Sequence, residues 1–265
     1  MKKYLVVGNP IEHSLSPKLQ NYWIKTNNIN AIYEKKKLNE NDLENLILKV
    51  KENKIHGINV TVPFKNKIIP YIDQLSLEAE NTKSVNTIYV NNGQIIGHNT
   101  DIAGFELGLK KIKYDVAGKK VLILGAGGVV PSIIFALNRL NADKIIVTNR
   151  TKEKAEKLKN LFEGLIVVDW GEICDFDMII NATSVGLNKN EKINLDLSKL
   201  GDNKFFYDLI YNPIETNFLK VGKSLGNRTE NGKYMFIYQS HQAFTIWHNL
   251  MPEINDEVIK IVTND

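Results

Sequence analysis

KKVLILGAGGVVPSIIFALNRLNADKIIVTNR, residues 119–150, is the stretch that decides the fold of this chain. An apolar strand at Lys119–Leu124 runs into Gly125-Ala126-Gly127-Gly128, and a helical stretch over 132–140 leads to a second strand at Lys144–Thr148. A strand, a glycine-rich turn and a helix in this order are typical of a dinucleotide-binding βαβ unit. The stretch therefore predicts a Rossmann-like α/β domain.

The chain after this stretch continues the alternation of strand and helix. A charged amphipathic helix is expected over residues 151–162, and strands are expected over 165–168, 178–180 and 205–209. Alternation of this kind implies parallel strands joined by right-handed crossovers. The C-terminus returns to helix, over residues 235–250 and again from Ile254.

The first third of the chain predicts a separate α/β unit, which gives way to the second unit near Asp101. Its strands are expected at 4–7, 32–33 and 58–62. One of its helices is indicated by apolar residues at helical spacing: Leu43, Leu46, Ile47 and Val50.

Two local signals place a helix start and a turn in this unit. Pro17 fits the first position of a helix, and Ser16 is the candidate N-cap before it. Asn91-Asn92-Gly93 lies between the apolar runs 87–90 and 94–97. An Asn-Gly pair in that setting predicts a tight β-hairpin.

Composition excludes several classes of protein. The chain has 265 residues, is 43% hydrophobic and carries a net charge of +4, which fits a globular enzyme and is too weak for a nucleic-acid-binding face. The densest basic run, Lys35-Lys36-Lys37, is interpreted as a solvated face. Cys174 is the single cysteine and is interpreted as a packing residue, so a reducing compartment is expected. The apolar N-terminus is too short for a signal peptide or membrane span, and we expect a cytoplasmic protein.

The residues after the strand at 144–148 indicate which dinucleotide is bound. NAD-binding sites commonly carry an acidic residue here for the ribose 2′-hydroxyl. This chain instead has Asn149-Arg150-Thr151, with Lys154 following. Arg150 can pair with a 2′-phosphate and stack on adenine, and an anion would suit Lys154 at a helix start. These residues favour NADP over NAD, although Val130 replaces the third glycine of the phosphate-binding fingerprint.

Clusters of polar residues follow the expected strands of the first unit. They are Ser14 and Ser16, then Asn59, Thr61 and Lys65, then Asn86 and Thr87, and finally Asn99, Thr100 and Asp101. Such hydroxyl and amide groups suit a polyhydroxylated ligand that bears a carboxylate. Lys65 and Asp101 are the plausible acid–base pair, because a lysine beside a carboxylate can protonate a carbonyl oxygen as hydride arrives. No histidine pair has metal-ligand spacing and no GxSxG motif occurs, so neither a metal site nor a serine hydrolase is expected.

Eight of these segments together resemble the bacterial shikimate dehydrogenases over nearly the full chain. Examples are GNPIEHSLSP at 8–17, GINVTVPFK at 57–65 and GHNTDIAG at 97–104. The others are VNT at 85–87, NRT at 149–151, NATSVG at 181–186, DLIYNP at 208–213 and the segment 231–239. The resemblance implies reversible NADPH-dependent reduction of 3-dehydroshikimate to shikimate, in the pathway to chorismate and aromatic amino acids.

The resemblance also implies roles for individual residues. Lys65 would donate and accept the proton, and Asp101 would orient Lys65 and the reacting hydroxyl. The residues expected to contact shikimate are Ser14, Ser16, Thr61, Asn86, Asp101, Tyr211 and Gln239. Those expected to hold NADP are Gly125, Ala126, Gly127, Gly128 and Val129 at the pyrophosphate, Asn149, Arg150, Thr151 and Lys154 at the adenosine phosphate, and Leu209 and Gly232 near the nicotinamide.

The implied α/β architecture has a substrate-binding and catalytic domain at 1–102, a Rossmann-like NADP domain at 103–233, and C-terminal helices at 234–265 that pack on the first domain. The expected partner is the small-molecule substrate, with no nucleic acid and no membrane, and the chain is expected as a monomer or homodimer. Three features depart from the family pattern: Gln20-Asn21, Lys83, and Val129-Val130-Pro131 after the glycine loop. A bulky Val130 is expected to push the helix from the strand and weaken cofactor binding.

Three alternative hypotheses about the function remain open. One is a quinate/shikimate dehydrogenase that uses NAD, which Arg150 argues against. Another is a non-catalytic NADP-binding sensor on the same fold, which retention of both Lys65 and Asp101 argues against. A methylene-tetrahydrofolate dehydrogenase-like enzyme would share the two-domain plan but would leave the pattern of Ser14, Ser16 and Asn86 unexplained.

Overall fold

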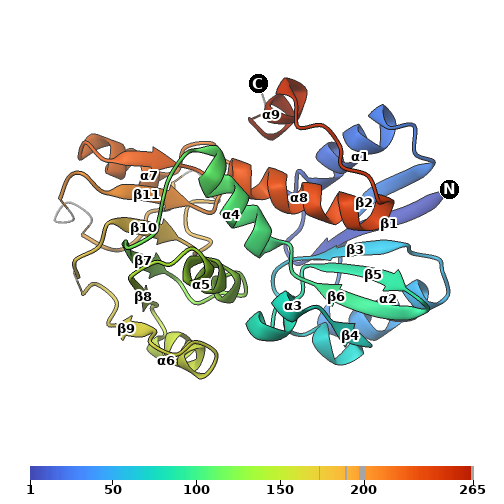
Figure 1. The fold of residues 1–265 in the computed structure, drawn as a ribbon, viewed down its shortest axis with the longest axis horizontal. Coiled ribbons are helices and arrows are strands. Elements are labelled where there is room, and N and C mark those ends of the chain that lie inside the picture. Colours follow the sequence, from blue (N-terminus) through green and yellow to red (C-terminus); the bar gives the residue numbers. More distant parts are fainter. Residues whose placement is uncertain (173, 189, 197–200, 264–265) are drawn as a thin grey trace. The chain divides into compact units, whose positions relative to one another are not determined.

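The computed structural model describes residues 1–172, 174–188, 190–196 and 201–263, which divide into two compact units. Unit 1 comprises Met1–Gly104 and Ile237–Asp265, and unit 2 comprises Phe105–Phe236. Within the described ranges, each unit has its own six-stranded sheet flanked by helices (Figure 1).

The sheet of unit 1 is mixed, with strand order β2-β1-β3-β5-β6-β4. β1 (Lys2–Gly8) lies between β2 (Ala31–Lys37) and β3 (Gly57–Val60) and runs parallel to both. The remaining strands are β4 (Gln74–Leu75), β5 (Thr87–Asn91) and β6 (Gln94–His98). β5 is antiparallel to β3 and β6, and β4 is parallel to β6. The ends of β1 and β3 therefore lie side by side, which brings the polar segments after them together.

Helices cover both faces of this sheet. On one face, Leu5 and Val7 of β1 share a buried core with the apolar side of α2 (Leu43–Lys51), including Leu46 and Ile47. On the other face, Tyr4 packs against Trp247 and His248 of α8 (Lys233–His248). The other helices described in this unit are α1 (Ser16–Thr26), α3 (Leu77–Thr82) and α9 (Asp256–Thr263), with 3-10 turns at Glu40–Asp42 and Ile69–Tyr71. Helix α4 (Asp101–Lys111) begins in this unit and continues into unit 2.

The sheet of unit 2 is parallel in every strand pairing of the described residues, with order β12-β11-β10-β7-β8-β9. Its strands are β7 (Lys120–Leu124), β8 (Lys144–Thr148), β9 (Ile166–Val168), β10 (Met178–Asn181), β11 (Phe205–Asp208) and β12 (Arg228–Glu230). The chain runs outward from β7 in one direction and, from β10, in the other. This reversal is the switch point at which doubly wound sheets bind ligands.

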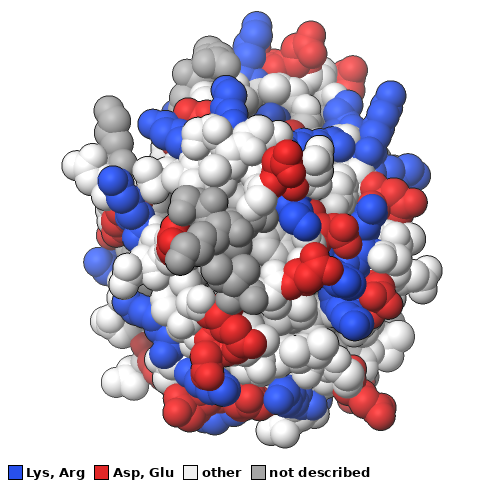
Figure 2. Space-filling view, turned by 90° about the vertical axis from the view of Figure 1, so that its left-hand side faces the viewer, with Lys and Arg blue, Asp and Glu red and all other residues white. Residues whose placement is uncertain are grey.

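The helices described between these strands are α5 (Val130–Arg139), α6 (Lys152–Glu156) and α7 (Asn217–Ser224), and a 3-10 turn at Lys157–Asn160 follows α6. Cys174 packs against a buried cluster around Phe176 and Ile193, which confirms its interpretation as a packing residue. On the face shown in Figure 2, basic and acidic side chains are interspersed. Among the described helices, none has the length and apolar character needed to cross a membrane.

Several local expectations need correction. Ser16 is the first residue of α1 and not its N-cap; Leu15 is the N-cap, and the Ser14 hydroxyl accepts the backbone N–H of Ser16 at 3.3 Å. The long helix expected over 151–162 is a short α6 followed by the 3-10 turn. The hairpin is confirmed, because Asn92 and Gly93 both have positive φ, at 49° and 78°, as a type I′ turn requires.

Candidate active site

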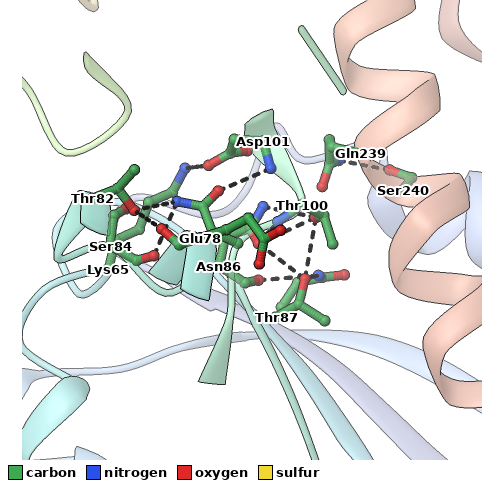
Figure 3. A network of polar contacts seen from close by, with 12 residues as sticks. Lys65, Glu78, Thr82, Ser84, Asn86, Thr87, Thr100, Asp101, Gln239 and Ser240 are labelled. Carbon is green, nitrogen blue, oxygen red and sulfur yellow. Dashed lines mark hydrogen bonds and ion pairs between the residues drawn. The ribbon is translucent and has the colours of Figure 1, made fainter. Parts of the chain in front are cut away.

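A buried ion pair stands at the centre of the candidate site in unit 1. The Lys65 ammonium donates to Oδ2 of Asp101 at 2.6 Å, and the two side chains are only 10% and 7% exposed (Figure 3). Two charges taken out of water incur a large desolvation cost, which their attraction offsets only when the geometry is good. A pair this close and this buried is therefore a candidate for chemistry and not a surface ion pair.

A buried amide, Asn99, fixes the carboxylate side of the pair. Asp101 is the first residue of α4, and its backbone N–H donates to Oδ1 of Asn99 at 3.0 Å. The Asn99 amide nitrogen in turn donates to the Thr82 hydroxyl and to the Ser84 carbonyl, each at 3.0 Å. The residue after Ser84, Val85, donates its N–H to the Lys65 carbonyl at 2.8 Å. One amide thus connects the backbone at Asp101 to the segment that holds Lys65.

A second polar network surrounds Asn86. Oδ1 of Asn86 accepts the backbone N–H of Thr100 at 2.8 Å, and its amide nitrogen donates to the Thr100 hydroxyl at 3.0 Å. Asn59 donates to the Asn86 carbonyl and to the Thr87 hydroxyl, and it accepts the Tyr33 hydroxyl at 2.7 Å. Every one of these five side chains is buried. The network fixes Thr100 directly beside Asp101.

The predicted residues at the end of β1 and β3 lie in connected segments. Thr61 donates its backbone N–H to the carbonyl of Val7 at 2.9 Å, which ties the end of β3 to β1. A Cβ on Gly8 would lie 2.5 Å from the Thr61 side chain, so a larger residue at position 8 would displace Thr61. Ser14 and Ser16 are joined by the hydrogen bond at the start of α1.

Helix α8 supplies the last predicted residue of unit 1. The amide nitrogen of Gln239 donates to the hydroxyl of its neighbour Ser240 at 2.7 Å (Figure 3). Gln20, one of the departures from the family pattern, is fully buried and donates to the Ser240 carbonyl at 2.9 Å. The departure at position 20 therefore still connects α1 to α8. Tyr211 belongs to unit 2, where it stacks on Phe236 with ring centroids 4.1 Å apart.

The glycine loop of unit 2 is built for close approach of a ligand. Gly125 has φ 110°, and a Cβ there would lie 3.1 Å from the carbonyl oxygen of Ala182, so this position requires glycine. The next residues are accessible, with Gly127 and Gly128 exposed, and they lead into the N-terminus of α5. Such a helix start attracts phosphate through its free N–H groups and its dipole. Val130, which replaces the third glycine, is fully buried as the first residue of this helix.

The predicted ribose-phosphate residues follow β8. Asn149 donates its amide to the Thr151 carbonyl at 2.7 Å, and Thr151 is the N-cap of α6 without a side-chain capping bond. Arg150 and Lys154 are both exposed, and neither has an ion-pair partner within the described ranges. Two unpaired cations near the ends of β7 and β8, beside an accessible glycine loop, fit the phosphates of NADP.

A buried carboxylate, Asp208, holds the segment predicted to lie near the nicotinamide. It accepts hydrogen bonds from the Asn181 amide at 3.0 Å, the Thr216 hydroxyl and the backbone N–H of Ile210. Burial raises the pKa of Asp208 to about 6, and these donors partly oppose the rise. Gly232 contacts this segment closely, because a Cβ on it would overlap the Leu209 carbonyl.

The residues that hold these side chains in place were not predicted to have this supporting role, although Asn59, Asn99 and Thr100 belong to the polar clusters that the sequence singled out. They are Asn59, Asn99, Thr100, Asn181 and Asp208, and each stands inside a quoted motif, so position in the motifs was the available signal. Among the described residues, no group of three or more histidine, cysteine or acidic side chains is arranged to hold a metal ion.

Comparison with known proteins gives consistent matches. Residues 6–88 match the shikimate dehydrogenase substrate binding domain, and residues 106–213 match the shikimate / quinate 5-dehydrogenase family. The NADP(+) shikimate dehydrogenase of Pelagibacter ubique is 56% identical over 261 residues, covering 98% of each chain. The shikimate dehydrogenase structure from Aquifex aeolicus superposes with a TM-score of 0.92 at 37% identity, covering 100% of this chain and 98% of the other. That from Thermus thermophilus, in complex with NADP(H) and shikimate, has a TM-score of 0.90 at 29% identity and covers 100% and 99%.

Proposed function

Since the chain belongs to the shikimate dehydrogenase family and is an NADP-dependent oxidoreductase that interconverts 3-dehydroshikimate and shikimate, we propose that Lys65 and Asp101 carry out its proton transfer. The single observation behind this assignment is the 2.6 Å contact between two nearly buried, oppositely charged side chains. A proton donor and a group that orients it need such fixed geometry.

Reduction of the ketone requires a hydride on the carbonyl carbon and a proton on its oxygen. NADPH supplies the hydride, and Lys65 supplies the proton from its ammonium group. Asp101, through its contact with the ammonium, holds the donor in place and stabilises its positive charge before transfer. In the reverse direction, the neutral amine of Lys65 accepts the proton of the substrate hydroxyl. The C–H and O–H bonds formed in reduction are those broken in oxidation.

The remaining predicted residues of unit 1 hold the substrate through neutral donors and acceptors. The Ser14 oxygen accepts the N–H of Ser16, which leaves the Ser14 O–H to donate to the substrate carboxylate. Ser16, Thr61, Asn86 and Gln239 contact the carboxylate and the ring hydroxyls, and Tyr211 is the remaining residue assigned to the substrate. Residues 1–102 together with 234–265 form the substrate-binding part, and residues 103–233 the NADP-binding part.

The cofactor residues fall into groups according to the part of NADP that each binds. Gly125 to Val129 hold the pyrophosphate through backbone N–H groups, and Arg150 and Lys154 hold the 2′-phosphate with Asn149 and Thr151 beside it. The absence of an ion-pair partner for Arg150 and Lys154 in the described residues supports this assignment, because each is left available to a phosphate. Leu209 and Gly232 lie at the nicotinamide. We assign the protein to the cytoplasm, which a single cysteine supports.

An absorbance assay at the nicotinamide band tests the proposed substrate and cofactor preference. Purified protein is offered shikimate or quinate, each with NADP⁺ or NAD⁺. We expect turnover with shikimate and NADP⁺ alone. Turnover with quinate or NAD⁺ would place the protein with the dual-specificity dehydrogenases, and NADPH binding without turnover would favour a sensor.

A further inference from the structure

A hollow of about 320 Å³ lies in unit 1, lined by strands β1 and β2 and by the end of helix α2 with the loop that follows. Its charged wall residues are Lys3, Lys35, Lys36, Lys49, Lys54 and Glu34. The whole chain has 34 basic and 30 acidic residues, so the residues outside the hollow carry 29 charges of each sign. The lining of the hollow therefore carries five basic residues against one acidic residue, whereas the rest of the chain is balanced in number.

The strand register shows which of these side chains share a face. Glu34 pairs with Leu5, and Lys36 pairs with Val7. Leu5 and Val7 lie in the core that α2 covers, and paired residues of neighbouring strands point to the same side. Glu34 and Lys36 therefore face the α2 side of the sheet, above a floor formed by the buried Leu5 and Ile55.

Lys35 points to the opposite face, since successive strand residues alternate, and its ammonium donates to the carbonyl of Glu12. It lines the hollow without offering its charge there.

The remaining lysines differ in how far they are neutralised. Lys3 forms an ion pair with Glu34, and Lys54 lies 2.8 Å from Glu52. Lys36 and Lys49 have no ion-pair partner in the part of the chain that the structure describes. Like charges at one hollow repel each other and create a local positive potential, which a bound anion would relieve.

We propose that this hollow is a second ligand site, separate from the residues for substrate and NADP, and that it binds a small polyanion with two or more negative charges. The volume is at the lower end of the range of about 300–1,000 Å³ for ligand pockets, so it suits a small metabolite and not a dinucleotide. Lysine acts as a point charge without the planar fork of arginine, and no arginine lines the hollow. Charge therefore selects the ligand, as either a phosphate ester or a polycarboxylate.

Isothermal titration of the full chain with pyrophosphate, and separately with citrate, tests the proposal. NADPH and shikimate are both present at saturation, so the substrate and cofactor sites are filled and no reaction proceeds. We expect one saturable site per chain that weakens as salt is raised. The variant Lys36→Gln/Lys49→Gln should raise the dissociation constant at least about tenfold, because it removes the two unpaired charges.

Two matched variants control the experiment. Lys25→Gln/Lys110→Gln removes two exposed lysines elsewhere and should leave the dissociation constant within about twofold, as expected for charges screened by solvent. Lys36→Arg/Lys49→Arg keeps the charge and should keep binding. Turnover and melting temperature of each variant confirm that it is folded.

The possible outcomes distinguish the class of ligand and show whether the site exists. Binding of pyrophosphate alone supports a site for phosphate esters, and binding of both probes supports a general polyanion site. The proposal is overturned if neither probe binds saturably, or if Lys36→Gln/Lys49→Gln binds them as tightly as the Lys25→Gln/Lys110→Gln control.

Discussion

The substitution Lys65→Met removes one charge from the buried pair while keeping a side chain of similar length. It deletes the ammonium that lies 2.6 Å from Oδ2 of Asp101. Loss of a general acid or base lowers kcat by about 10²-fold or more, which corresponds to about 2.7 kcal/mol on the barrier. The substrate is held by other groups, so KM for shikimate should change little.

The same substitution should also destabilise the protein. It leaves the Asp101 carboxylate buried without a counter-charge, and breaking a buried ion pair in this way typically costs about 3–5 kcal/mol. Adding Asp101→Asn to Lys65→Met removes the unpaired charge and should recover most of that stability. Turnover should not recover, because the proton donor is still missing.

Steady-state kinetics and urea unfolding are measured on the wild type, Lys65→Met, Asp101→Asn and the double variant. Together they separate the loss of proton transfer from the loss of stability. If Lys65→Met retains a kcat within a few-fold of the wild type, Lys65 is not the proton donor. If the double variant regains turnover together with stability, the loss in the single variant reflects folding, and the proposed chemistry is wrong.

Three further outcomes are expected. Arg150→Ala should raise KM for NADPH at least about tenfold, since a hydrogen-bonded charge pair is lost, and change KM for NADH little; an equal rise for both cofactors would remove the 2′-phosphate assignment. Asn99→Ala removes the amide that holds the backbone of Asp101 and should lower kcat several-fold while leaving KM for NADPH unchanged; an unaltered kcat would show that Asp101 is oriented without it. Burial, with a contribution from Lys2, lowers the pKa of His248 to about 4. The histidine of the unfolded chain therefore takes up a proton near pH 6.5, the ordinary pKa, whereas that of the folded protein does so only near pH 4. The free energy of unfolding therefore falls by about 1–2 kcal/mol as pH falls from 6.5 to 4, after allowance for solvent screening. Melting curves should show a smaller loss of stability for His248→Leu than for the wild type over the same pH range.

The parts of the fold that sequence predicts best are those where local pattern and tertiary packing agree. Residues 119–150 predict β7, the glycine loop, α5 and β8, because long apolar runs alternate there with a helical pattern. The shorter elements α3, α7, β4 and β12 went unpredicted. With between two and eight residues each, they are too short to show a period and depend on the packing around them.

The N-terminus of α1 shows how a correct residue preference can give the wrong position. Serine is favoured as an N-cap, and Ser16 stands just before Pro17. In the structure, however, Ser14 already accepts the backbone N–H of Ser16, and the helix begins at Ser16 itself. The N-cap is Leu15, so the sequence placed it one residue too late.

Side-chain networks across long sequence separations are invisible to periodicity. Lys65 and Asp101 were paired from their chemistry, yet the contacts from Asn99 to Thr82 and Ser84 join residues 17 and 15 positions apart without any shared pattern. The lysine hollow gives a second example. Lys35-Lys36-Lys37 by itself predicts a solvated face, and only the fold brings Lys36 near Lys49 from another element. Lysines that are far apart in the sequence thus come together because helix α2 packs on the side of the sheet to which Lys36 of strand β2 points.

Among the described residues, two aspartates are buried, and their surroundings give them different roles. Asp101 faces an ammonium directly, so its negative charge has a fixed counter-charge and can in turn hold that ammonium ready to give up a proton. The donors that Asp208 meets in the described ranges are neutral groups of Asn181, Thr216 and the backbone of Ile210, and burial raises its pKa to about 6. A carboxylate that accepts three hydrogen bonds in different directions is suited to holding a loop, and here the loop is the segment around Leu209. The chemistry therefore belongs to the aspartate with the charged partner, and the one with neutral partners serves as the anchor.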